Sequence, residues 1–214
     1  MTGVGEGYDG RVFINCPFDQ AYLPLLRPLL FTIVYLGFVP RIASASSDSG
    51  ELRLHKICQL IRESRFSIHD LSRLQADMGG EYYRMNMPFE LGIDYGCRAF
   101  ADGRLRQKRC LILEERRYEY MKALSDLAGV DIKDHGGEPM SLVRQVRNWF
   151  LETAGVQRPP SPTLIWRAFN AFMVDFREKR KAEGFSDEDL EWMPVAELIG
   201  FMKEWVQEGR ETAG

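Results

Sequence analysis

One acidic residue in the stretch NMPFELGIDYG (residues 86–96) is the strongest candidate for chemistry in this chain. Glu90 stands near the start of a predicted helix, after a predicted strand and a polar loop. A glutamate at this place either satisfies backbone amides of the first helical turn or offers a free carboxylate for a reaction. If Pro88 takes the first helical position, Glu90 follows two residues later and points back toward the strand ends.

Polar residues also follow the first three predicted strands, at the point where each strand ends. Ligands of an open parallel sheet bind in the crevice beyond the carboxyl ends of its strands, so we expect these residues to converge with Glu90. A carboxylate near a sugar anomeric carbon can stabilise or capture an oxocarbenium ion, while a second polar group holds the ribose hydroxyls. The converging segments are NCPFDQ (15–20), SASSDSG (44–50) and HDLS (69–72).

Predicted strands and helices alternate along the chain, and they carry Glu90 and the polar segments named above. Apolar runs predict strands at 11–16, 39–45, 66–72, 109–115 and 130–135. Apolar residues at helical spacing predict helices at 20–37, 51–64, 87–100, 118–129 and 138–155. This alternation predicts an α/β fold with an open, mostly parallel sheet of about five strands flanked by helices, in the flavodoxin-like order.

Composition shifts divide the chain into four predicted parts. A glycine-rich, flexible tail (1–10) precedes the α/β domain (11–155), and the proline-rich linker 156–162 leads to a C-terminal helical extension (163–214). Two apolar stripes in the extension predict a helical hairpin. Because burying one such side chain is worth about 1.5–3 kcal/mol, we expect the hairpin to dock on the α/β domain and to contribute to a homo-oligomeric interface.

The composition of the 214 residues argues against several classes of protein. A net charge of −3 offers no basic field for nucleic acid. The apolar stretch AYLPLLRPLLFTIVYLGFV is interrupted by Arg27 and two prolines, so we expect a buried core helix and no membrane span. The first residues lack the layout of a signal peptide, which favours a cytoplasmic location. The four scattered cysteines form no CxxC pair, so we expect reduced core thiols and no metal site.

The segment FSIHDLS, followed by a loop and NMPFELGIDYG, resembles the nucleoside 2-deoxyribosyltransferase-like superfamily and the related bacterial Toll/interleukin-1 receptor (TIR) domains. RVFINCPFD is similar to their first strand and loop. The resemblance covers about residues 11–150. It implies that Glu90 is the catalytic carboxylate and that Asp70 lines the sugar site. The loop between these two residues is longer than the DxGT-type loop common in the transferases.

The resemblance also implies a substrate class. It favours cleavage of the N-glycosidic bond of a nucleotide, as an NAD+ hydrolase or an ADP-ribosyl cyclase of the antiphage-defence type, with NAD+ as substrate and no separate cofactor. Two alternatives stay open: a nucleoside deoxyribosyltransferase or nucleoside-monophosphate glycosidase, and a non-catalytic TIR-like module that senses a nucleotide or binds a partner. The residues assigned to substrate binding are Asn15, Pro17, Phe18, Asp19, Ser44, Ser72, Arg84 and Asn86.

Three neighbouring side chains have ordinary structural interpretations. Strand alternation aims His69 away from the side of Asp70, which favours a packed core histidine over an acid–base role. Cys16 follows a strand but has no evident histidine partner, which argues against a nucleophile. Tyr22 can stack on a base, although helix packing is the more common role of such a tyrosine.

Overall fold

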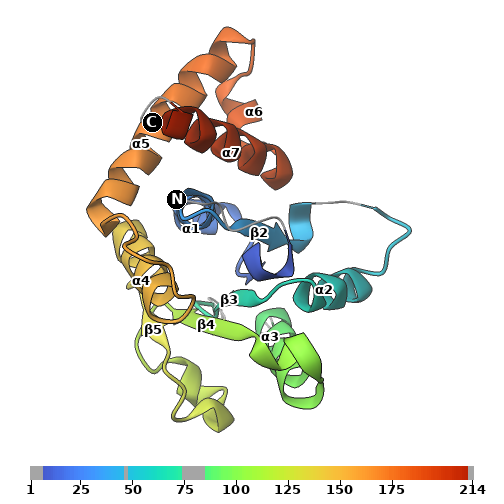
Figure 1. Cartoon of the computed structure of the whole chain (residues 1–214). Coiled ribbons are helices and arrows are strands. Elements are labelled where there is room, and N and C mark those ends of the chain that lie inside the picture. The colour runs from blue at the N-terminus through green and yellow to red at the C-terminus, as the bar shows by residue number, and fades with distance from the viewer. Residues whose placement is uncertain (1–6, 46–47, 74–84, 212–214) are drawn as a thin grey trace.

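The computed structural model describes residues 7–45, 48–73 and 85–211. It contains one parallel sheet with the strand order β2-β1-β3-β4-β5 (Figure 1). This confirms the predicted flavodoxin-like α/β fold. The strands are β1 (Arg11–Asn15), β2 (Val39–Ile42), β3 (Phe66–Asp70), β4 (Arg109–Glu114) and β5 (Lys133–Asp134).

Helices cover both faces of the sheet. On one face α1 contacts α4, and on the other α2 contacts α3. α1 is buried on almost every side, as its nearly uniform apolar sequence predicts. The four helices are α1 (Leu23–Tyr35), α2 (Arg53–Arg62), α3 (Asn86–Phe100) and α4 (Pro139–Glu152).

The alternation of side chains along the strands assigns residues to the two faces. Val12 and Ile14 belong to the core cluster under α1 and α4, whereas Phe13 belongs to the cluster under α2. Phe66 and Ile68 of β3 lie on the α1 side in the same way. Because successive residues of a strand point to opposite faces, the side chains of His69 and Asp70 lie on opposite faces of the sheet at the end of β3.

The helix predicted at 118–129 is absent, and this prediction was wrong. The segment forms two short 3-10 turns, η5 (Tyr120–Lys122) and η6 (Ser125–Leu127). The carboxylate of Glu114 accepts hydrogen bonds from the amides of Tyr118 (2.7 Å) and Tyr120 (3.2 Å). Tyr118 takes a positive φ of 67°. A side chain that bonds nearby amides competes with helix formation, which explains the irregular path.

The C-terminal helices α5 (Pro162–Ala182), α6 (Asp187–Glu191) and α7 (Val195–Glu211) dock on α1, as predicted. The ring of Phe31 in α1 lies 5.5 Å from Phe172 and 5.8 Å from Trp205, between ring centroids. One core cluster therefore continues from the sheet through α1 into these helices (Figure 1). α6 interrupts the expected hairpin and begins with a capping box at Ser186.

The segments at the two predicted boundaries are both attached to the fold. In the glycine-rich N-terminal part, Tyr8–Gly10 form a 3-10 turn, η1, and the Tyr8 hydroxyl donates to the carbonyl of Arg104 at 3.0 Å. In the proline-rich segment, the carbonyls of Pro159 and Pro160 accept hydrogen bonds from Arg147 of α4, at 2.8 and 2.9 Å. These contacts hold both segments against the α/β core.

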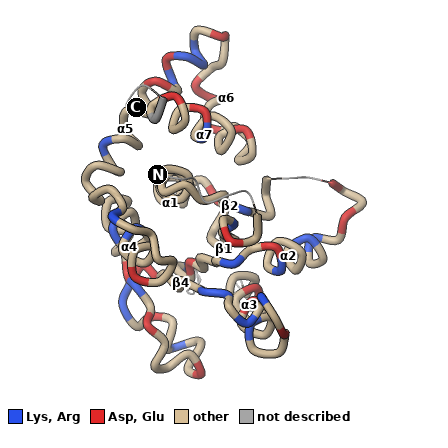
Figure 2. Tube along the Cα trace, viewed as in Figure 1, with Lys and Arg blue, Asp and Glu red and all other residues tan. Residues whose placement is uncertain are grey.

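The distribution of charge and the length of the apolar helices bear on the expectations of no basic field and no membrane span. Basic and acidic residues are interspersed along the chain (Figure 2). Within the described residues, no helix has both the length and the apolar character needed to cross a bilayer.

Candidate active site at the carboxyl edge of the sheet

Glu90 does not cap a helix. α3 begins at Asn86, so Pro88 is its third residue and Glu90 its fifth. The helix predicted over 87–100 therefore begins one residue earlier than expected, and Pro88 does not take its first position. Pro88 is tolerated because the first-turn amides of a helix have no carbonyl partner within the helix. Glu90 lies beyond that turn, where backbone amides bond within the helix, so the amide-capping interpretation does not apply.

The Glu90 carboxylate is buried and has no strong partner. Only 7% of the residue is exposed. Among the described residues, it makes no hydrogen bond or ion pair. Burial raises the pKa of Glu90, and the positive charges of Arg53 and His69 only partly oppose that rise. A buried, unpartnered carboxylate with a raised pKa beyond the strand ends is typical of a functional group.

Asp70 has the opposite environment, because protein donors already surround it. Its Oδ1 accepts from the amide of Ser72 at 2.9 Å and from the hydroxyl of Ser72. Its Oδ2 accepts from the hydroxyl of Tyr22 and from Nε2 of His135 at 3.1 Å. The amide of Gly137 donates to Nδ1 of His135, so Nε2 carries the proton that His135 shares with Asp70. Burial alone would raise the pKa of Asp70, but the donors lower it.

The predicted contact of Asp70 with a ribose does not fit this geometry. Asp70 is fully buried, and its four acceptor positions are used inside the protein. Its partners lie on the α1 side of the sheet, whereas Glu90 belongs to α3 on the other side. We therefore assign Asp70 to fixing the position of Ser72, two residues after β3 ends.

Asp70→Asn is expected to lower the free energy of unfolding by about 2–3 kcal/mol, because an amide nitrogen would face donors that need an acceptor. The variant should keep more than half of the substrate affinity of the wild type once folded. Urea unfolding and a binding titration at a temperature where both proteins are folded measure the two effects. If Asp70→Asn is as stable as the wild type but no longer binds the substrate, the predicted contact of Asp70 with the ribose is supported instead.

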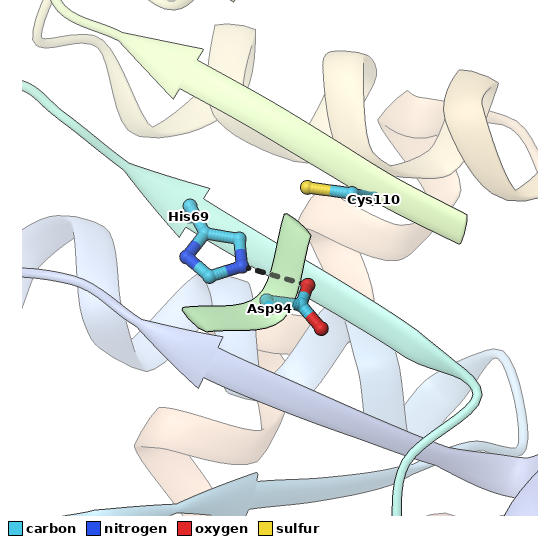
Figure 3. A group of neighbouring side chains, drawn as sticks. All are labelled: His69, Asp94 and Cys110. Atoms are coloured by element: carbon cyan, nitrogen blue, oxygen red, sulfur yellow. Dashed lines mark hydrogen bonds and ion pairs between the residues drawn. The ribbon is translucent and has the colours of Figure 1, made fainter. Parts of the chain in front are cut away.

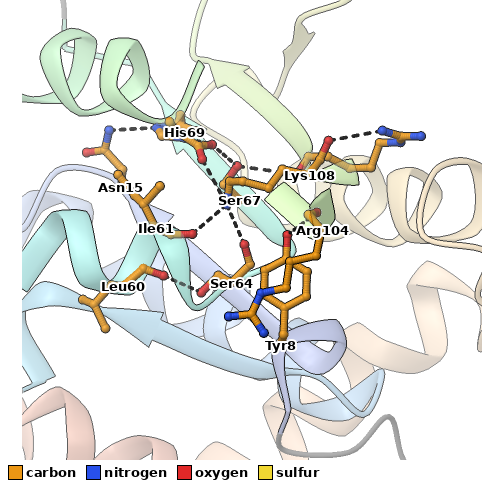
Figure 4. Close-up of polar contacts among 11 residues, drawn as sticks. Tyr8, Asn15, Leu60, Ile61, Ser64, Ser67, His69, Arg104 and Lys108 are labelled. Carbon is orange, nitrogen blue, oxygen red and sulfur yellow. Dashed lines mark hydrogen bonds and ion pairs between the residues drawn. The ribbon is translucent and has the colours of Figure 1, made fainter. Parts of the chain in front are cut away.

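A second buried network, on the α3 side of the sheet, includes Asn15, His69 and Lys108 (Figure 4). Nδ2 of Asn15 lies 2.9 Å from both Nδ1 of His69 and the carbonyl oxygen of Met87. Nε2 of His69 lies 3.1 Å from Oδ2 of Asp94, and Nζ of Lys108 lies 3.1 Å from Oδ1 of Asp94. Because Met87 is in the first turn of α3, this network holds the turn that directly precedes Glu90. The predicted core role of His69 agrees with its complete burial.

His69, Asp94 and Cys110 place a nitrogen, an oxygen and a sulfur ligand within 4.8 Å of one another (Figure 3). These are ligand types that zinc accepts. However, Lys108 already pairs with Asp94, and both ring nitrogens of His69 have partners. Burial disfavours a charged His69, yet Cys110 and Asp94 raise its pKa to about 10. A cluster that already holds the ammonium group of Lys108 attracts a metal ion poorly, so we interpret it as structural.

The other residues assigned to substrate binding differ in exposure. Phe18 is 39% exposed, and Ser44 and Asn86 are exposed as well, so these three are accessible to a ligand. Asn15 and Pro17 are buried. Asp19 accepts from the amide of Tyr22 as the cap of η2 (Gln20–Tyr22), and it also pairs with Arg73. Ser72 is bound to Asp70 and to His135, and Arg84 lies outside the described residues.

Sequence reasoning missed two groups of this edge. His135 follows β5 directly, so the rule that polar residues at strand ends converge applies to it as well. Arg53 opens α2 and is the main positive charge acting on Glu90. No local pattern marks Arg53, because its role depends on how α2 packs beside α3. Burial and nearby carboxylates raise the pKa of Cys16 well above its usual value, so its thiol is protonated and a poor nucleophile.

Comparison with protein-family models, with curated proteins and with solved structures found no match for this chain. The fold and the site together define an α/β protein of flavodoxin-like topology with a buried carboxylate beside the ends of β1 and β3. In this topology, that pair of strands forms the switch point where ligands bind.

Proposed function

We propose that this protein cleaves the N-glycosidic bond of a nucleotide, with NAD+ as the favoured substrate and Glu90 as the catalytic carboxylate. The observation that supports the proposal best is the contrast between Glu90 and two other buried carboxylates, those of Asp70 and Asp94. Asp70 and Asp94 are bound by donors from the protein, whereas Glu90 has no hydrogen bond or ion pair among the described residues. A protein gains nothing in stability from such a carboxylate, so a chemical role accounts for it.

In this mechanism, the bond between C1′ of the ribose and the nicotinamide nitrogen breaks, and its electron pair leaves with nicotinamide. The ionised Glu90 stabilises the ribosyl cation or bonds to C1′. Water then adds to C1′ and loses a proton, which yields ADP-ribose; where Glu90 has bonded to C1′, the water displaces the carboxylate and that bond breaks. Asn15 contributes by binding the Met87 carbonyl, which fixes the first turn of α3 three residues before Glu90.

Mass spectrometry of the products separates the proposal from its alternatives. The protein is incubated with NAD+ and, separately, with a pair of 2′-deoxynucleosides. We expect nicotinamide and ADP-ribose, or a cyclic ADP-ribose, from NAD+. Base exchange between the deoxynucleosides would identify a transferase instead, and NAD+ binding without any product would identify a sensing module.

We also propose that the C-terminal helices form a homo-oligomeric contact. Their surface exposes Leu164 and Val174 of α5, and Trp192 after α6, at 50%, 56% and 65%. Removal of these helices would uncover α1, so a surface variant is the better test. We expect light scattering to show an oligomer for the wild type at high micromolar concentration and a smaller species for Val174→Glu. A monomeric wild type, even with NAD+ present, would contradict the proposal.

A further inference from the structure

We propose that a pocket toward the amino edge of the sheet binds a small compound that carries two phosphate groups. The pocket lies between α2 and η4 (Gly103–Gln107), and its volume is about 670 Å³. This volume is within the usual range of small-molecule sites. Arg62 ends α2 shortly before β3 begins, and η4 directly precedes β4. The pocket is therefore separate from the Glu90 site, which lies at the carboxyl edge.

Two arginines line this pocket with guanidinium groups that have no acidic partner. Arg62 comes from α2 and Arg104 from η4, and both residues are exposed, so a ligand can reach their N–H groups. In the part of the chain that the structure describes, neither guanidinium makes an ion pair or a hydrogen bond. A guanidinium presents its N–H groups in a planar fork that matches phosphate oxygens. Because the two arginines belong to different elements, a ligand with two phosphate groups can engage both of them.

Tyr8 holds Arg104 in place (Figure 4). The guanidinium carbon of Arg104 lies 4.7 Å from the centroid of the Tyr8 ring, and the Tyr8 hydroxyl donates to the carbonyl of Arg104 at 3.0 Å. A ring against the face of a guanidinium leaves the N–H groups at its edge free. The Arg104 side chain is therefore ordered before a phosphate binds, which lowers the entropy cost of binding.

The two acidic residues of the pocket oppose an anion only weakly. Oε2 of Glu63 pairs with Arg11 at 3.0 Å and with Arg41 at 3.3 Å, so two cations balance its single negative charge. The side chain of Asp102 is 99% exposed and lies 4.0 Å from Arg106, so water and salt screen its charge. The pocket therefore presents a basic surface on a protein whose net charge is −3.

Calorimetric titration of the full chain with inorganic pyrophosphate and with inorganic phosphate tests the proposal. Low ionic strength limits the screening of the exposed arginines, and divalent cations are left out because they neutralise pyrophosphate. We expect saturable binding of pyrophosphate and at least about tenfold weaker binding of phosphate, because two linked groups engage both arginines at a high effective concentration. Equal affinities, or no saturable binding of pyrophosphate, would overturn the proposal.

Variants locate the binding. Arg62→Gln and Arg104→Gln remove exposed side chains, so both should fold, and each should weaken pyrophosphate binding by about tenfold or more. Arg144→Gln, at an exposed position of α4 on the other face of the sheet, changes the net charge equally and should bind like the wild type. Glu90→Gln should also bind like the wild type. Equal weakening by Arg144→Gln would reduce the effect to net charge, and a changed affinity in Glu90→Gln, or full binding in the Arg62 and Arg104 variants, would assign the ligand to another site.

Discussion

Glu90→Gln is expected to lower the turnover of NAD+ by about 10²–10⁴-fold, while the protein stays folded. Glutamine has nearly the same shape but carries no negative charge for the ribosyl cation. The folded protein should be as stable as the wild type or slightly more stable. The pKa of Glu90 is raised by burial, so its ionised form opposes folding at neutral pH and its removal costs nothing.

Kinetics and thermal unfolding of Glu90→Gln measure the two effects together. Glu152→Gln, at an exposed position at the end of α4, is the matched control and should retain wild-type turnover. For the wild type, activity should fall as pH decreases through a pKa that lies above the usual glutamate value, because the protonated acid cannot stabilise a cation. Wild-type turnover by Glu90→Gln would exclude the proposed mechanism.

Lys108→Met is expected to lower the free energy of unfolding by about 3–5 kcal/mol. Lys108 is 1% exposed and pairs with Asp94, which is also buried. Methionine is unbranched and only one atom shorter than lysine, but it leaves the Asp94 carboxylate without this cation. It also leaves the carbonyls of Ile61 and Ser64 without the Lys108 donor. Denaturant unfolding at neutral pH is the measurement.

Lys179→Met is the matched control, because Lys179 pairs with Glu208 at 3.5 Å on the surface, where the side chains are 58% and 65% exposed. It should cost less than about 1 kcal/mol. The double variant Lys108→Met/Asp94→Leu should recover part of the lost stability, since the carboxylate left without Lys108 is removed as well. A Lys108→Met protein as stable as Lys179→Met would contradict a stabilising role for the buried pair.

The same network predicts how stability depends on pH. Burial alone would raise the pKa of Asp94, but the hydrogen bond and charge of His69, with the charge of Lys108, lower it to about 2. The contribution of Asp94 to stability is therefore fully present above its unfolded pKa of about 3.9 and is lost as pH falls toward about 2.

The sequence by itself determined the fold class and the approximate positions of the strands, whose observed ends lie one to three residues before the predicted ones. Apolar runs such as RVFIN and RCLILE have strand character wherever they are placed, and their alternation with helical patterns leaves few topologies. Polar residues after those runs identified the edge at which Glu90 lies. Side-chain alternation also separated His69 from Asp70, because it is a property of every extended chain.

Only the tertiary structure decided which of these polar groups is left free. Asp70 and Glu90 are both acidic residues near the end of β3, and nothing in their neighbours along the chain distinguishes them. His135 binds Asp70 across 65 positions of sequence, while α3 carries Glu90 to the other side of the sheet. The connection 118–129 is a similar case, since Glu114 binds its amides and prevents the predicted helix. Burial and pairing arise from contacts between distant segments, which local patterns do not encode.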